Sequence, residues 1–533
     1  MQFPLFTPPT EWVMPDGYPN LAHAKEVAID LETRDPNLLS HGSGWARGDG
    51  EVIGVAVSAG ADSWYFPIRH QNGGNLDPKQ TLAWVKDLCS VDRDYIMHNA
   101  LYDAGWLWRE GIDIKGRIID TMIVGALLDE NRFSYALNAL GRDYLGERKN
   151  EAELNEAAQS FGVNAKSEMW KLPAHFVGAY AEHDATITLK LWDVLRKEIT
   201  KEECSGIFDL ETRLTHLLLD MKTTGVRVDL NKAEQVKKEL TALEKSLVEE
   251  IVKETGVTIE PWVATSVAKV FDAMGLAYSR TEKSRAPAFT KQFLANNTHP
   301  IAQKIIKIRE INKANTTFVD TILEHSHNGR IHCDFHSLRS DGGGTVTGRF
   351  SSSNPNLQQI PARDPEIKKL IRGLFIPEEG HKWGSFDYAS QEPRWLAHYC
   401  GSLTGQNKHP QIDQVIEMYN KGNADFHQMV ADMAGISRKQ AKTVNLGIMY
   451  GMGKKKLADV MGVDEEEATK LLATYHEKVP FVKGIAERTS SHAKEHGVIR
   501  TWLGRKCRFD MWEPVSYGYN KAMPLAEAQK EYG

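Results

Sequence analysis

Residues 25–33 read KEVAIDLET, an apolar stretch that ends in acidic residues. Apolar side chains bounded by charged ones predict a short β-strand here. Asp30 and Glu32 lie two positions apart, and alternate residues of a strand face the same side of its sheet. Both carboxylates can therefore reach one metal ion, so this strand is also a candidate site.

The segments that follow the strand predict an α/β domain over residues 1–200. The stretch EVIGVAVSAGADSWYFPI at 51–68 indicates two strands joined by a Gly-Ala-Asp turn. Residues 116–130 and 173–199 have apolar side chains at helical spacing.

The composition excludes several classes of protein. A chain of 533 residues with 41% hydrophobic and 26% charged residues is typical of a globular protein of several domains. No apolar run is long enough to cross a membrane, and the N-terminus lacks the basic start and apolar core of a signal peptide. The five cysteines form no CxxC pair, which disfavours a zinc site and favours a reducing cytoplasm. A net charge of −6 still allows a local basic channel.

The next part of the chain has a different character. Residues 205–330 contain long amphipathic helices, two of which we expect to end at Gly225 and Gly256, because glycine is favoured at helix C-termini. Residues 340–361 are rich in Gly, Ser and Asn and predict a loop. A long helical run is expected at 426–450.

Three further residues could complete a metal site with the acids of the first strand. Asp103 follows in MHNALYDAGWL, and Tyr180 and Asp184 lie four apart in YAEHD, which puts them on one face of a helix. Carboxylates from a sheet edge and a helix can hold two Mg²⁺ ions that activate water for phosphodiester hydrolysis. Tyr180 could orient that water. A single acid of this kind is more often a cap or turn residue, so the prediction rests on the set.

A second group of residues indicates a nucleotide site. In SFDYASQEPRW, Asp387 directly follows the apolar Phe386. This pattern suggests an acid at the end of a strand that could hold a metal ion. In RKQAKTVNLGIMYGMG, residues at four-residue steps form one helix stripe of cation, cation, apolar and aromatic side chains: Arg438, Lys442, Leu446 and Tyr450. The cations could hold phosphates while the other two pack on sugar and base. The alternative is a solvated cationic face over a core stripe.

The four acids and the tyrosine of the predicted metal site resemble a known exonuclease pattern. The DxE pair, then HNxxYD, then YxxxD occur in the order and spacing of the three motifs of the DEDDy 3′→5′ exonucleases. The resemblance spans residues 25–195 and implies an RNase H-like fold.

The later segments resemble family A DNA polymerases, the phage members above all. The stripe is similar to their fingers helix RxxxKxxxFxxxYG, DYASQEPR to DYSQIELR, TGRFSSSNPNLQQIP to TGRLSSxxPNLQNIP, and GVIRTWLGRKCRF to GxxxTxxGRxR. The resemblance implies a multidomain fold of α/β and α+β parts, the right-hand polymerase with an added exonuclease. We expect an exonuclease domain at 1–200, a helical thumb at 201–335, the N-terminal part of the palm at 336–400, fingers at 401–515 and a truncated tail at 516–533.

The same resemblance implies roles for individual residues. Asp387 would bind both catalytic Mg²⁺ ions, assisted by the carbonyl of Tyr388, and Glu392 would pair with Tyr450 to exclude a ribose 2′-hydroxyl. Arg438 and Lys442 would hold the triphosphate of a dNTP, and Lys442 would protonate the leaving pyrophosphate. The residues implied to contact primer-template DNA are Arg349, Asn356, Gln358 and Arg505.

The sequence departs from the family pattern at several positions. Leu446 stands where Phe or Tyr is usual, which leaves sugar selectivity open. Gln359 replaces a usual Asn. Ala389, Ser390 and Pro393 alter the first palm motif without removing its acids.

The second palm carboxylate of the family lies in a His-Asp-Glu turn, and this sequence contains none. His precedes Asp only at His183–Asp184, within the exonuclease pattern. We therefore expect a DNA polymerase with proofreading that is split or truncated, completed by a C-terminal polypeptide with that turn, and located in the cytoplasm of a phage host. Two alternatives stay open: a stand-alone 3′→5′ exonuclease with DNA-holding domains, and a catalytically silent primer-template binding protein.

Overall fold

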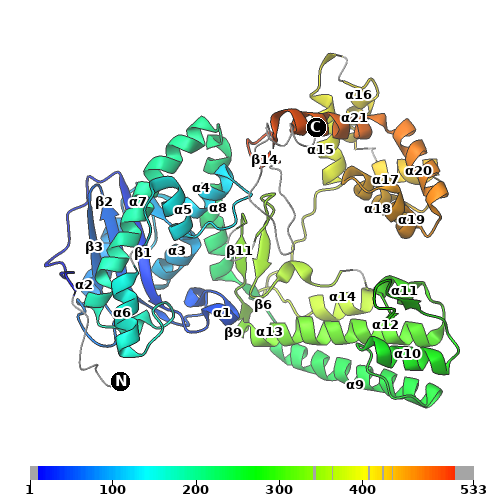
Figure 1. The fold of residues 1–533 in the computed structure, drawn as a ribbon, viewed down its shortest axis with the longest axis horizontal. Helices are drawn as coiled ribbons and strands as arrows, with labels where there is room; N and C mark the ends of the chain where they lie inside the picture. The colour runs from blue at the N-terminus through cyan, green and yellow to red at the C-terminus, as the bar shows by residue number, and fades with distance from the viewer. Residues whose placement is uncertain are drawn as a thin grey trace. The chain divides into compact units, whose positions relative to one another are not determined.

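The strand expected at 25–33 lies at the centre of a five-stranded sheet. The strand order is β3-β2-β1-β4-β5. Figure 1 labels β1, β2 and β3 of this sheet. The strands are β1 (Glu26–Arg34), β2 (Glu51–Ala59), β3 (Asp62–Pro67), β4 (Asp94–Met97) and β5 (Arg117–Asp120). β1 pairs antiparallel with β2 and parallel with β4, and its register with β2 shifts between Glu32 and Thr33. The hairpin expected at 51–68 is confirmed as β2 and β3.

The computed structural model describes residues 10–149, 151–339, 344–362, 364–405, 408–422, 425–434 and 436–509. The chain forms two compact units, one comprising residues 1–383 with 502–505 and the other 384–501 with 506–533. The predicted tail at 516–533 lies outside the described residues. Within the described ranges, no helix is both long and apolar enough to cross a membrane.

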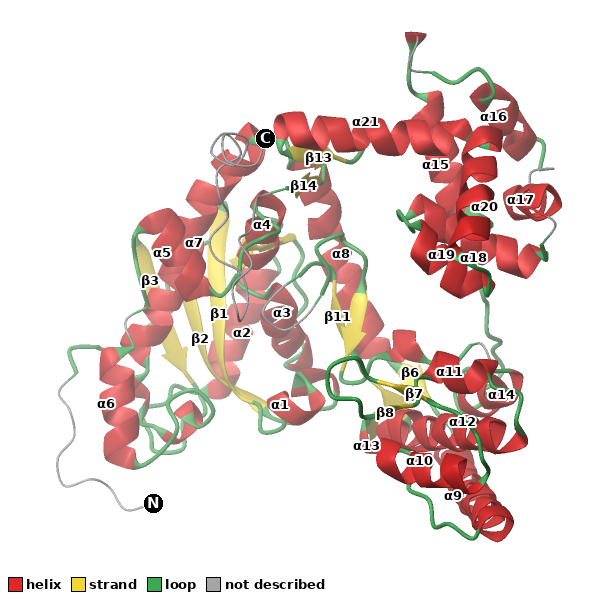
Figure 2. Ribbon diagram, turned by 45° about the vertical axis from the view of Figure 1, so that its right-hand side comes forward, coloured by secondary structure: helices red, strands yellow, loops and turns green. Residues whose placement is uncertain are grey.

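Helices cover both faces of the sheet in the first unit. They are α2 (Pro78–Cys89), α3 (Ala100–Arg109), α4 (Thr121–Leu128), α5 (Leu137–Leu145), α6 (Ala152–Phe161), α7 (Gly178–Lys201) and α8 (Ser205–Thr224). Val27, Ile29 and Leu31 of β1 pack in the core shared with α2 and α3. Ala28 faces the opposite core, to which α4, α5 and α7 contribute. Because strand residues alternate, Asp30 and Glu32 share the face of Ala28, and α7 runs along that face (Figure 2).

The helical part expected after residue 205 is confirmed. It continues through α9 (Leu230–Thr255), α10 (Ala264–Ala273), α11 (Lys291–Asn296), α12 (Pro300–Lys313) and α13 (Asp320–Glu324). α8 and α9 end before Gly225 and Gly256, as expected, and Gly256 has the left-handed φ of 70° that favours glycine. A π-helical turn, Ala314–Val319, joins α12 to α13. A small three-stranded sheet belongs to this part, with the order β6-β10-β9. Its strands are β6 (Val226–Arg227), β9 (Ser326–His327) and β10 (Arg330–Ile331).

The loop expected at 340–361 contains a short strand instead of being irregular throughout. Ser351–Ser353 (β12) pairs antiparallel with Asp334–His336 (β11). Turn-forming residues dominate this segment, so its composition does not reveal three serines whose backbone is paired by a distant strand.

The second unit is a helical cluster. Its helices are α15 (Gln391–Gly401), α16 (Ile412–Asn420), α17 (Phe426–Ala434), α18 (Arg438–Met449), α19 (Lys454–Met461), α20 (Glu465–Lys478) and α21 (Pro480–His496), followed by β13 (Val498–Arg500) and β14 (Lys506–Arg508). The single helix expected at 426–450 is wrong. Ser437 begins a new helix there: its hydroxyl accepts from the Gln440 amide, and the Gln440 side chain accepts from the Ser437 amide.

Asp387 does not lie at the end of a strand, contrary to the sequence expectation. Residues 381–388 are irregular and exposed, and Phe386 is 98% exposed. Within the described chain, no strand pairs with this segment. An apolar residue before an acid is therefore not sufficient to form a strand without a neighbouring strand to bond with.

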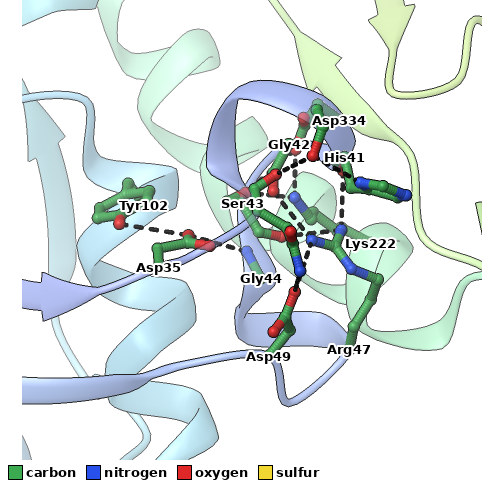
Figure 3. A network of polar contacts seen from close by, with 12 residues as sticks. Asp35, His41, Gly42, Ser43, Gly44, Arg47, Asp49, Tyr102, Lys222 and Asp334 are labelled. Atoms are coloured by element: carbon green, nitrogen blue, oxygen red, sulfur yellow. Dashed lines mark hydrogen bonds and ion pairs between the residues drawn. The ribbon is translucent and has the colours of Figure 1, made fainter. Parts of the chain in front are cut away.

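A buried ion pair ties the loop after β1 to the rest of the first unit (Figure 3). Lys222 of α8 donates to Asp334 of β11 and to the Ser43 hydroxyl, and its ammonium lies 5.0 Å from the centre of the Trp45 ring. The Lys222 side chain is 7% exposed. Burial lowers the pKa of Lys222, and Asp334 opposes that effect. The pair therefore fastens residues 42–45 to two distant elements.

Replacing Asp334 with asparagine is expected to destabilise the first unit by about 3–5 kcal/mol, because it leaves the Lys222 charge buried without its counter-ion. Urea unfolding measures the change. Asp209→Asn is a matched control, since Asp209 pairs with Arg213 where both side chains are more than half exposed, and it should cost under about 1 kcal/mol. Equal stability of the two variants would show that the buried pair contributes no more than a surface one.

Candidate active sites

The acids of β1 face helix α7. Asp30 pairs in register with Ala56 of β2, and Glu32 with Gly54, so both side chains leave the sheet on the same side. A Cβ at Gly54 would collide with the Tyr65 ring, whose hydroxyl hydrogen-bonds His70 Nε2 at 2.7 Å. Glycine at 54 thus lets an aromatic ring pack tightly beside the acids.

Asp103 is buried in the first turn of α3, and its side chain is bound to β1. Its Oδ1 accepts from the Leu31 amide at 2.9 Å, which joins α3 to β1 between Asp30 and Glu32. The start of α3 is in turn held by Asp120, which accepts from the amides of Asn99 and Ala100 at 3.0 and 2.8 Å. Asp120 also caps α4. The sequence analysis missed Asp120, although an Asp-Thr pair directly after the apolar residues Ile118 and Ile119 is a recognisable cap signal.

Tyr180 and Asp184 lie on one face of α7, as their spacing predicted. The sequence analysis did not find their partner, Lys149, which comes from the loop after α5. The Lys149 ammonium forms an ion pair with Asp184 Oδ2, donates to the Tyr180 hydroxyl at 3.2 Å and lies 5.3 Å from the Tyr180 ring centre. Asp184 Oδ1 is buried and has no hydrogen-bond partner.

The pKa values of the acids in this cluster are shifted because the carboxyl groups are buried and lie close to one another. Burial, and next the charge of Asp184, raise the pKa of Asp30 to about 7. Burial also raises the pKa values of Glu32, Asp103 and Asp184. Burial lowers the pKa of Lys149, but the nearby carboxylates outweigh it and the net pKa is raised. The folded chain binds these protons more tightly than the unfolded one, so the metal-free fold loses stability as pH rises from about 4 through about 7.

Asp30, Glu32, Asp103 and Asp184 offer the carboxylate oxygens that a divalent cation prefers as ligands. Mg²⁺ prefers carboxylate oxygens, and a buried carboxylate oxygen without a partner is costly unless a cation meets it. Asp184 Oδ1 is such an atom. In the described part of the chain, no three acidic, histidine or cysteine side chains yet converge as a ready ligand set. The acids come from one sheet face and from two helices, α3 and α7, so their side chains would have to converge to share a cation.

The predicted nucleotide stripe lies along α18 in the second unit. Arg438 begins the helix and pairs with Asp425 at 2.7 Å, Lys442 is exposed, and Tyr450 follows the last turn and is 68% exposed. Leu446 is partly buried. The stripe thus presents its ends to the surface, while the core face of the helix carries Ala441, Val444 and Ile448.

His427 of α17 lies against α18, the helix that carries the stripe. It is buried and contacts the Asn445 side chain at 3.1 Å. Burial lowers the pKa of His427, and the charges of Arg438, Lys442, Asp425 and Glu392 all act on it. Glu392 and the two cations of the stripe thus each lie near enough to His427 to act on its charge, and the pairing predicted between Glu392 and Tyr450 stays a prediction. The sequence analysis missed His427, because a lone buried histidine carries no spacing signal.

The remaining residues predicted for the polymerase site are either exposed or bonded to neighbouring residues. Asp387 and Tyr388 are exposed in the irregular segment before α15. In the first unit, Arg349 is exposed, Asn356 Oδ1 accepts from the Gln358 amide at 3.1 Å, and Gln358 donates to the Phe350 carbonyl at 2.9 Å. Arg505 pairs with Glu211 of α8, and both side chains are largely buried.

Comparisons with known proteins address the whole chain. A sequence profile of DNA polymerase family A matches residues 230–523, and one of 3′-5′ exonucleases matches residues 16–200. A DNA-directed DNA polymerase of Pseudomonas phage M6 is 34% identical over 97% of this chain and 86% of its own length. DNA polymerase DpoZ of Acinetobacter phage SH-Ab 15497 is 29% identical over 92% of this chain and 83% of its own length.

A solved structure shares the fold. The POL domain of Pol1 from M. smegmatis, in complex with DNA primer-template and dNTP, aligns with a TM-score of 0.71 and 22% sequence identity. The alignment covers 91% of this chain and 79% of that one.

Proposed function

Because the chain belongs to DNA polymerase family A and is a DNA-directed DNA polymerase with a 3′→5′ exonuclease domain, we propose that it proofreads in a two-Mg²⁺ site formed by Asp30, Glu32, Asp103 and Asp184. Enzymes of both domain types generally depend on divalent metal ions. The observation that carries the proposal is the meeting of β1 and α7, which sets the DxE pair against Tyr180 and Asp184.

The chain's own groups define the chemistry of this site. The bound ions would supply an activated water and stabilise the departing 3′ oxygen. The Tyr180 hydroxyl would orient that water, which its position one helical turn from Asp184 on the same face supports. Asp103, fixed to the Leu31 amide, would hold the third side of the site.

For synthesis, we propose that the stripe on α18 binds the incoming dNTP. Arg438 and Lys442 would hold its phosphates, and Leu446 and Tyr450 would pack on its sugar and base. Glu392 would exclude a 2′-hydroxyl, and Asp387 with the Tyr388 carbonyl would bind the metal ions. The residues proposed to contact primer-template DNA are Arg349, Asn356, Gln358 and Arg505. Arg438 would exchange Asp425 for phosphate, and Arg505 would have to leave Glu211.

No His-Asp-Glu turn occurs in these 533 residues, so this proposal leaves the second palm carboxylate of the family unassigned within them. We propose that a C-terminal polypeptide carrying that turn completes the site. The domain boundaries at 200, 335 and 400 stay predictions. The phage relatives support action on DNA in the cytoplasm of a bacterial host.

Lys442→Ala tests the nucleotide site in the completed enzyme. Its charge would meet the triphosphate where negative charge develops, so the mutation should slow extension about 100-fold or more while changing primer-template affinity less than about threefold. Primer extension at saturating DNA and a gel-shift titration measure the two effects. Lys470→Ala is the control, since Lys470 of α20 is exposed and pairs only with Glu466 in the described structure. Equal losses of extension and DNA affinity would instead make Lys442 a DNA-phosphate contact.

A further inference from the structure

The loop that carries Lys149 is fastened to α7 at three consecutive residues. Glu147 pairs with Lys190 at 3.0 Å, the Arg148 carbonyl contacts His183 Nε2 at 3.1 Å, and Lys149 contacts Asp184. The Lys149 amide also donates to Asn138 Oδ1 at 3.1 Å. These contacts lie along one side of α7. They fix the backbone of the loop beside the helix and so hold Lys149 next to Asp184.

Lys149 is the cation that acts on most of the acids. Its charge opposes the raised pKa values of Asp30, Glu32 and Asp184. Its side chain is 18% exposed and that of Asp184 3%, so water screens the pair poorly. Two roles fit such a charge. It could substitute for a metal ion and be displaced on loading, or it could remain and position a neighbour.

The division of Asp184 between its two oxygens favours the second role. Lys149 occupies Oδ2 and leaves the buried Oδ1 without a partner, so a cation can bind Oδ1 while the lysine stays. The same ammonium donates to the Tyr180 oxygen. A phenol that accepts one hydrogen bond from an ammonium, with its ring held beside that charge, has fewer directions left for its own proton.

We propose that Lys149 is a positioning residue of the exonuclease: it clamps Asp184 and the Tyr180 hydroxyl together so that this hydroxyl orients the attacking water. The inference rests on the exonuclease site proposed above. It adds a residue that acts through Tyr180, without itself touching the reacting atoms.

A double-mutant cycle with Tyr180 tests this role. Lys149→Met removes the charge while keeping the length of the side chain. It is expected to lower kcat for Mg²⁺-dependent degradation of single-stranded DNA about 10- to 100-fold, with KM changed less than about twofold. In a Tyr180→Phe background the same change should have less than about a twofold effect, because the hydroxyl that it positions is gone. Lys190→Met removes the neighbouring exposed tie and should stay within about twofold of the wild type.

Calorimetric titration of the metal-free variants with Mn²⁺ supplies a readout other than activity. A positioning lysine predicts Mn²⁺ affinity within about threefold of the wild type in Lys149→Met. Wild-type turnover in Lys149→Met, an undiminished effect in the Tyr180→Phe background, or several-fold tighter Mn²⁺ binding would each overturn the proposal, the last by showing that Lys149 competes with metal. Asp184→Ala separates the two levels: if it too leaves degradation intact, the exonuclease site itself is misassigned.

Discussion

Replacing Asp184 with alanine is expected to reduce Mg²⁺-dependent removal of 3′ nucleotides about a thousandfold or more. Asp184 places a buried carboxylate oxygen without a partner beside the acids of β1, and water cannot replace that charge. The rate of shortening of a 5′-labelled single strand measures the effect. Asp30→Ala should behave in the same way, since the charge of Asp184 raises the pKa of Asp30 and the two carboxylates are proposed to hold the same metal ions.

Folding of the variants has to be measured separately from activity. Burial disfavours the charged form of Asp184, but removing it leaves the largely buried Lys149 ammonium without its ion-pair partner, so thermal unfolding must show that each variant is folded at the assay temperature. Asp193→Ala is a matched control on the same helix, because Asp193 is half exposed and pairs with Arg196 at the surface. Wild-type rates in both acid variants would rule out the assigned metal ligands.

The second large effect concerns synthesis. These 533 residues should bind primer-template but extend it at least about a thousandfold more slowly than the enzyme completed by a polypeptide with a His-Asp-Glu turn. In the proposed function Asp387 is the one palm carboxylate assigned, a single carboxylate would not fix two metal ions, and Asp387 lies in an exposed, irregular segment. Extension of a labelled primer in the Asp184→Ala background measures synthesis without interference from degradation. Adding the second polypeptide is expected to restore it.

The controls for this prediction separate binding from chemistry. A gel shift should show that primer-template binding survives in the chain alone, so that a lack of extension reflects the chemical step. Robust templated extension by the purified chain, free of host polymerase, would contradict the account and show that another acid within it serves as the second ligand.

Local signals predicted the parts of the site that depend on periodicity. The two-residue spacing of Asp30 and Glu32 indicated a shared sheet face, and the four-residue spacing of Tyr180 and Asp184 indicated a shared helix face. Glycines 225 and 256 marked helix ends correctly. Each of these depends on backbone geometry over a few residues, which the amino-acid pattern alone can specify.

The parts that the sequence did not reveal depend on tertiary contacts. Lys149 lies 35 positions from Asp184, and nothing in its neighbourhood distinguishes it from a surface lysine. The position of His427 likewise depends on the packing of α17 against α18. The expected strand before Asp387 does not form. A strand needs a neighbouring strand to bond with, and the described chain provides none there.

The measurement that most directly tests the central claim, a metal site shared by β1 and α7, is calorimetric titration of the metal-free full chain with Mn²⁺ at neutral pH. Wild-type protein and the Asp30→Ala and Asp184→Ala variants are compared, and any binding at Asp387 contributes equally to all three. The account predicts that the tighter binding phase of the wild type disappears in both variants and persists in Asp193→Ala. Titrations of Asp30→Ala and Asp184→Ala that match the wild type would contradict it.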